Sequence, residues 1–111
     1  MIWRVRERAA LDRISRSGRR VQRGPLWARL LPDPDEQPPR VAFAISRRHG
    51  GAVQRNRLRR RLRAALWIAD PPLPPGSYLV GARPDADQLS SGELTVAVTA
   101  LIEAVRAQVP A

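Results

Sequence analysis

Apolar residues that recur every three to four positions predict three helices along the chain. The first covers residues 8–17 and ends before Gly18, a residue type that commonly follows a helix C-terminus. The clearest covers residues 52–69, whose apolar side chains fall within roughly 100° of arc on one side of the helix. The last begins after a capping-box pattern formed by Ser90 and Glu93 and carries apolar residues at helical spacing.

Shorter segments, some with alternating large and small side chains, predict strands between those helices. The strands are expected at 19–22, 26–31, 40–46 and 77–83. Two proline-dense stretches, 32–39 and 70–76, cannot pair as central strands and are predicted to be loops. The resulting order, α-β-β-β-α-β-α, defines an α+β sandwich of roughly four strands and three helices. We expect it to form a single domain over residues 1–111.

The residue types exclude several classes of function. The chain has no cysteine and one histidine, so a disulfide scaffold, a Cys-ligated metal site and a Ser-His-Asp relay are not expected. A metal site built from several histidines is not expected either. The one histidine, His49, lies in a glycine-ended turn and is expected to be solvated, with a phosphate contact as the alternative. No apolar run approaches the roughly 20 residues of a membrane span, and no signal region is visible, so a cytoplasmic protein is expected.

Charge is the property that points to a partner. Twenty basic residues, all of them arginine, stand against ten acidic ones and give a formal net charge of +10. The distribution is uneven, because residues 1–63 hold 18 of the arginines and residues 40–63 hold nine arginines and no acid. The preference for arginine fits a coding bias that also enriches alanine and proline. Guanidinium groups nevertheless bind phosphates in a forked geometry and stack on bases.

The segment from Arg55 to Arg63 concentrates that charge on the helix predicted at 52–69. Its leucines are expected to dock on the sheet, which leaves six arginines on the remaining surface. Arginines four residues apart repel one another by a few tenths of a kcal/mol per pair, and no acid lies nearby in sequence. A polyanion would relieve this repulsion, and its binding would weaken steeply with salt. The alternative is a solvated basic face without a specific partner.

Asn56 interrupts the arginines with a side chain of different chemistry. Its amide accepts as well as donates hydrogen bonds, so it suits a ribose 2′-hydroxyl, a base edge or a metal-bound water. The alternative is an ordinary polar residue on a helix surface.

The stretch from Arg40 to Arg63 resembles the signature region of the bacterial ribonuclease P protein component. In this chain the signature consists of the strand Arg40-Val41-Ala42-Phe43, the turn Ser46-Arg47-Arg48 ending in Gly50-Gly51, and Ala52-Val53 followed by Arg55-Asn56-Arg57. Elsewhere, Tyr78 to Pro84 looks like the family's hydrophobic strand that ends in Ala-Arg-Pro, and Leu11 to Gly18 resembles its first helix. The resemblance covers nearly the whole chain.

The resemblance implies a protein subunit of an RNA-based endoribonuclease, with no catalytic side chain and no metal ligand in the protein. In that family the catalytic subunit is an RNA, and Mg²⁺ held mainly by the RNA drives the cut that matures the 5′ end of precursor tRNA. The protein binds the catalytic RNA and the 5′ leader of the precursor, and its basic helix forms a left-handed crossover between parallel strands. No membrane and no obligate protein partner is expected. The residues implied to face the catalytic RNA are Arg47, Arg48, Arg55, Asn56, Arg57, Arg59, Arg60 and Arg63.

The leader-binding cleft is the part where this chain departs from the family. Leu11 and Ser15 stand where the first helix usually presents two aromatics, and Arg29 stands where the second strand often carries a tyrosine. We hypothesise that Trp27 and Arg29, two residues apart on one strand face, partly replace them by stacking and by phosphate or cation–π contact. Core packing is the alternative for Trp27. The predicted cleft residues are Leu11, Ser15, Trp27, Arg29 and Phe43, with a core position as the main alternative for Phe43.

Two other functions would use the same basic helix. A non-catalytic protein that binds structured RNA, such as a ribosome-associated factor, would bind mature and precursor tRNA equally. A DNA-binding module would place the helix in a major groove, but the sequence shows no helix-turn-helix pattern and no dimerising heptads.

Overall fold

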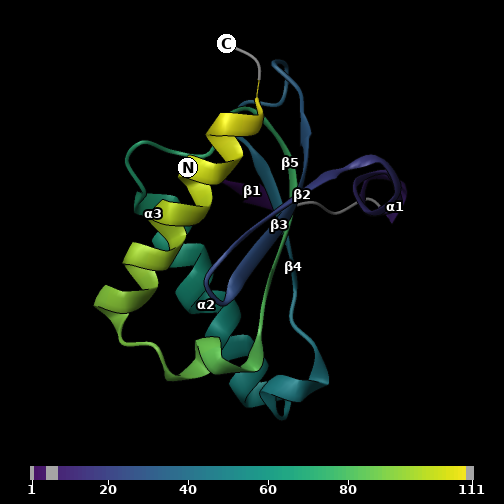
Figure 1. Cartoon of the computed structure of the whole chain (residues 1–111). Helices are drawn as coiled ribbons and strands as arrows, with labels where there is room; N and C mark the ends of the chain where they lie inside the picture. The colour runs from purple at the N-terminus through teal and green to yellow at the C-terminus, as the bar shows by residue number, and fades with distance from the viewer. Residues whose placement is uncertain (1, 5–7, 110–111) are drawn as a thin grey trace.

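A computed structural model describes residues 2–4 and 8–109 of the chain. Its sheet has five strands in the order β1-β4-β5-β3-β2, with helices on both faces (Figure 1). The strands are β1 (Trp3–Arg4), β2 (Arg19–Arg23), β3 (Leu26–Pro32), β4 (Arg40–Ala44) and β5 (Gly76–Ala82). The helices are α1 (Arg8–Ser17), α2 (Ala52–Ile68) and α3 (Ser91–Gln108), with short 3₁₀ helices η1 (Arg47–His49) and η2 (Pro84–Gln88).

The sheet topology agrees with the predicted element order and adds one strand. Strands β2, β3 and β5 pair antiparallel, whereas β4 lies parallel to β5 and is joined to it through α2. The additional strand β1 has two residues, Trp3 and Arg4, and lies parallel to β4 at the sheet edge. Two residues are too few to show an alternating pattern, which is why the sequence did not predict this strand.

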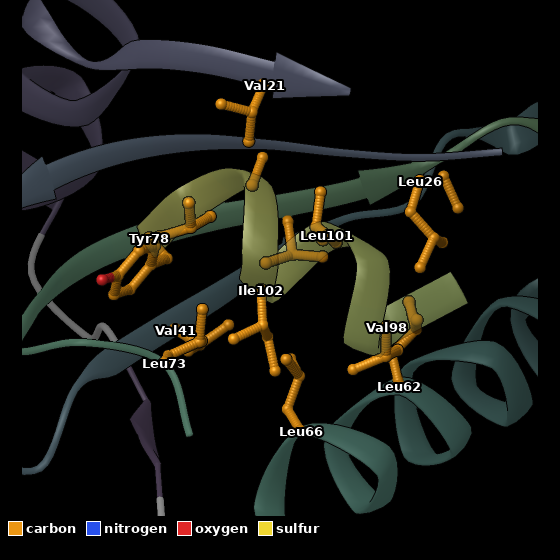
Figure 2. Close-up of a cluster of buried hydrophobic side chains, with 14 of the residues drawn as sticks. Val21, Leu26, Val41, Leu62, Leu66, Leu73, Tyr78, Val98, Leu101 and Ile102 are labelled. Carbon is orange, nitrogen blue, oxygen red and sulfur yellow. The ribbon is translucent and has the colours of Figure 1, made fainter. Parts of the chain in front are cut away.

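One face of the sheet packs against α2 and α3 and forms the main core (Figure 2). Side chains alternate between the two faces of each strand, so Leu30, Val41 and Tyr78, which are partners in register, all point into this core. Tyr78 is fully buried and its hydroxyl donates a hydrogen bond of 2.6 Å to the carbonyl oxygen of Pro74. Burial raises the pKa of this hydroxyl far above its ordinary value, so Tyr78 stays neutral.

Three leucines fix α2 in place, and we call them the leucine seam. Leu58, Leu62 and Leu66 are spaced four residues apart, lie on one side of the helix and are buried against the core. Each buried leucine contributes about 1.5 to 3 kcal/mol relative to an exposed one. The seam therefore decides which side of α2 is buried and leaves its arginines toward the surface.

Helix α3 begins with the capping box that the sequence predicted. The backbone N–H of Glu93 donates to Ser90 Oγ at 3.1 Å, and the backbone N–H of Ser90 donates to Glu93 Oε1 at 2.9 Å. These bonds to Ser90 lower the pKa of the Glu93 carboxyl. None of the helices in the described part of the chain is apolar over a length that would cross a bilayer.

Candidate nucleic-acid interface

The arginines of α2 divide between two flanks, on either side of the leucine seam. On the flank next to the sheet edge they join β1 around a surface hollow of about 500 Å³, which we call the arginine hollow. Its lining residues are Arg4, Val53, Asn56, Arg59, Arg60 and Arg63. Four arginines and no acidic side chain line it, so the hollow has a strongly positive potential.

Two arginines of this flank are held in defined orientations. Arg59 Nη1 donates a hydrogen bond of 2.8 Å to Asn56 Oδ1. The guanidinium carbon of Arg63 lies 5.7 Å from the ring centroid of Phe43, within the range of a cation–π interaction. Asn56 was predicted to contact a 2′-hydroxyl, a base edge or a metal-bound water, with an ordinary surface residue as the alternative. In the structure its oxygen accepts from Arg59, so Asn56 orients that guanidinium.

The opposite flank carries Arg57 and Arg61, beside Asp87 of η2. Arg61 Nη2 donates a short hydrogen bond to the carbonyl oxygen of Leu89, which ties α2 to the segment before α3. Arg57 is exposed. Arg55 is half-buried, and its Nε has no hydrogen-bond partner among the residues that the structure describes. Arg61 thus stabilises the fold, whereas Arg57 is available to a ligand.

The turn before α2 exposes Arg47 and Arg48 and buries His49, which corrects the prediction of a solvated histidine. The side chain of His49 has Nδ1 3.0 Å from Asp87 Oδ2 and Nε2 2.9 Å from the carbonyl oxygen of Ala82. The turn forms η1, and it lies against η2 and the end of β5. Sequence alone cannot show this packing, because Ala82 and Asp87 lie more than 30 residues away in the chain.

The residues predicted to bind the leader fall on two different faces of the sheet. Trp27 and Arg29 of β3 share a face, as predicted, and α1, the helix that carries Leu11 and Ser15, contacts β3 and β5. Leu11 is half-buried and Ser15 is exposed. Phe43 lies on the other face, against the core and under Arg63. Phe43 points to the same side of β4 as the buried Val41, so the structure favours the core position for Phe43 over the cleft.

Trp27 packs flat against the backbone of β5. A Cβ added at Gly81 would lie 2.2 Å from Cζ2 of the indole, so only glycine leaves room for the ring. The guanidinium carbon of Arg20 on β2 lies 5.1 Å from the indole centroid. Arg20 and Trp27 are diagonal neighbours, since Arg20 pairs with Arg29 in the β2–β3 register.

Sequence reasoning did not identify two of these basic residues. Arg4 joins the arginine hollow through β1, and no pattern in the sequence could have revealed that strand. Arg20 could have been found, because the predicted hairpin around Gly24 and Pro25 fixes which residues of the two strands face one another.

The fold and this surface together define a small basic α+β protein suited to a polyanionic partner. A model of the family Ribonuclease P matches residues 2–106. The ribonuclease P protein component of Thermobifida fusca is 38% identical to this chain in an alignment 110 residues long. The alignment covers 92% of this chain and 75% of that protein. The chain belongs to the ribonuclease P protein family.

Solved structures with low sequence identity share the fold. The RNase P protein of Staphylococcus aureus has a TM-score of 0.80 at 19% identity, covering 91% of this chain and 93% of that one. The RNase P protein of Thermotoga maritima has a TM-score of 0.75 at 21% identity, covering 93% of this chain and 96% of that one. The α+β fold that the sequence predicted is confirmed.

Replacing Gly81 by alanine should displace the Trp27 indole. We expect Gly81→Ala to lower the free energy of unfolding by about 1 to 3 kcal/mol, because the new Cβ overlaps the ring. Urea unfolding and the near-ultraviolet circular dichroism of the tryptophans measure the effect. Gly92→Ala in α3 is the control, since a Cβ there meets no atom within 4 Å. Equal stability of the two variants would show that Trp27 does not rest on Gly81.

Proposed function

We propose that this chain serves ribonuclease P by binding two RNA segments on two faces of one domain. Membership of the family makes it a subunit of the ribonucleoprotein that matures the 5′ end of tRNA. The catalytic RNA occupies the α2 side and the 5′ leader of precursor tRNA occupies the sheet face beside α1. The observation that carries the proposal is the arginine hollow, where four arginines from two elements converge with no acid among them.

The α2 side binds through an arginine surface, which consists of Arg4, Arg47, Arg48, Arg55, Asn56, Arg57, Arg59, Arg60 and Arg63. Phosphates of a folded RNA neutralise these charges, release counterions and remove the repulsion between neighbouring guanidinium groups. The contacts with Asn56 and Phe43 hold the guanidinium groups of Arg59 and Arg63 in defined orientations before RNA binds. Less side-chain entropy is then lost on binding.

The protein contributes positioning to the reaction, and the catalytic RNA carries the chemistry. The donor set of the arginine surface does not suit Mg²⁺, which prefers oxygen ligands, because guanidinium groups cannot ligate a cation and Asn56 Oδ1 already accepts from Arg59. No group of three or more His, Asp or Glu side chains is placed to hold a metal within residues 2–4 and 8–109. As the family resemblance implies, we propose that the magnesium ions of the reaction are held mainly by the RNA.

The face beside α1 binds the leader through Trp27 and the arginines around it. The indole rests on Gly81, and Arg20 lies over it while Arg29 occupies the same strand face. A leader base can stack on this pair, and the leader phosphates can bind the two guanidinium groups. Binding here adds affinity for precursor tRNA over mature tRNA, which has lost the leader.

Reconstitution tests the proposed function. The purified protein is mixed with a bacterial ribonuclease P RNA and precursor tRNA at a magnesium concentration where the RNA alone is nearly inactive. We expect cleavage at the mature 5′ end to be restored. A protein that is folded by circular dichroism but restores no cleavage would overturn the proposal. Equal affinity for precursor and mature tRNA would favour a general structured-RNA-binding protein.

Removing two exposed arginines of α2 should lower the salt dependence of RNA binding. For the double variant Arg57→Ala, Arg60→Ala we expect weaker binding of the catalytic RNA. The slope of log affinity against log salt concentration should become shallower by up to about two, because up to two phosphate contacts are lost. Filter binding at several salt concentrations measures it. Arg106→Ala, an exposed arginine of α3, should leave the slope unchanged. An unchanged slope in the double variant would contradict the assigned surface.

Trp27 should distinguish precursor from mature tRNA. Trp27→Ala is expected to reduce the preference of the holoenzyme for precursor by about 1 to 3 kcal/mol, the value of one base stacked on an aromatic ring. Mature-tRNA affinity should stay the same. The exposed Trp67 at the end of α2 provides the matched control, Trp67→Ala, which should retain the full preference. If the two variants behave alike, the leader does not stack on Trp27.

A further inference from the structure

The buried imidazole of His49 meets a hydrogen-bond acceptor at each ring nitrogen. The Ala82 carbonyl can only accept, so Nε2, at 2.9 Å, must carry a hydrogen. The other nitrogen, Nδ1, lies 3.0 Å from the Asp87 carboxylate. A neutral imidazole has one N–H and would turn a lone pair toward that carboxylate. The imidazolium form satisfies both partners and forms a charge-assisted hydrogen bond with Asp87.

This pair connects three elements at the start of the basic helix. His49 is the last residue of η1, Ala82 ends β5 and Asp87 belongs to η2. The residues that follow His49 are Gly50, with a φ of 104°, and Gly51, so the backbone between η1 and α2 has little stiffness of its own. The contacts of His49 therefore restrain the exposed Arg47 and Arg48 relative to β5 and η2.

Other charges around the pair make its protonation sensitive to a polyanion. On the side of α2, Arg57 and Arg61 line the same small hollow as Asp87. Together with Arg47 and Arg48 on η1, these guanidinium groups oppose a further positive charge on His49. Phosphates bound to Arg47, Arg48 and Arg57 would offset that opposition. RNA binding and protonation of His49 then favour each other by the same factor.

We propose that His49 is a positioning residue for RNA binding, and that its imidazolium holds the Arg47-Arg48 turn against Asp87 in the RNA-bound state. The inference rests on the proposed function, in which these arginines bind the catalytic RNA. It predicts that the complex takes up a proton at His49 when it forms. Affinity for the RNA therefore rises as the pH falls through the range in which histidine changes charge.

The first test measures affinity for a bacterial ribonuclease P RNA at about pH 6 and about pH 8 with the salt concentration fixed. Wild-type protein should bind about three- to tenfold more tightly at the lower pH, the range expected for one hydrogen bond. His49→Gln and Asp87→Asn should lose most of this difference. Asp85→Asn removes the same charge from η2 two residues away and should keep it. Equal pH dependence in wild type and His49→Gln would overturn the inference.

The second test follows the imidazole directly, because the chain has a single histidine. Nitrogen-15 spectra of the ring should show both nitrogens protonated at the lower pH. The hydrogen on Nδ1 should exchange with solvent more rapidly in Asp87→Asn, and more slowly when the RNA is added to the wild type. An Nδ1–H signal that ignores Asp87→Asn would refute the pairing even if His49→Gln did not fold. A signal that depends on Asp87 in a protein that binds no RNA would instead show that the proposed function has failed.

Discussion

Burial of the leucine seam holds together a set of arginines that repel one another. Leu58, Leu62 and Leu66 each contribute about 1.5 to 3 kcal/mol on burial, whereas each repelling pair of arginines four residues apart costs a few tenths of a kcal/mol. The hydrophobic contribution is the larger one, so α2 forms and docks on the sheet without a bound partner. In the proposed function, RNA phosphates neutralise the charge and relieve the repulsion that remains on its outer side.

The sheet separates the two surfaces assigned to RNA. Alternation along each strand sends Tyr78, Val41 and their neighbours toward α2 and α3 (Figure 2). The same alternation places Trp27 on the opposite face of the sheet. Phe43 lies on the first face, where its ring is 5.7 Å from the guanidinium carbon of Arg63 and helps to hold that side chain in place. A single small domain can in this way hold a large RNA on one side and a single strand on the other.

Local patterns in the sequence were sufficient for the three helices and for strands β2 to β5. The spacing of leucines in α2 fixed its buried side, and the Ser90–Glu93 capping box located the start of α3. Features that depend on distant contacts were not predictable. His49 is buried because β5 and η2 close over it, and Arg4 reaches the arginine hollow because β1 pairs with β4. Family resemblance supplied the partner RNA, which charge alone would have left as an unspecified polyanion.

The most direct test of the central claim is the salt dependence of protein stability in the absence of RNA. The free energy of unfolding in urea should rise between about 0.05 and 0.5 M sodium chloride, because screening weakens the repulsion among the arginines of α2. In the variant Arg57→Gln, Arg60→Gln the rise should be smaller. A free energy of unfolding that falls with salt, or that rises equally in both proteins, would contradict the claim. It would show that repulsion among the arginines of α2 does not lower the stability of the free protein.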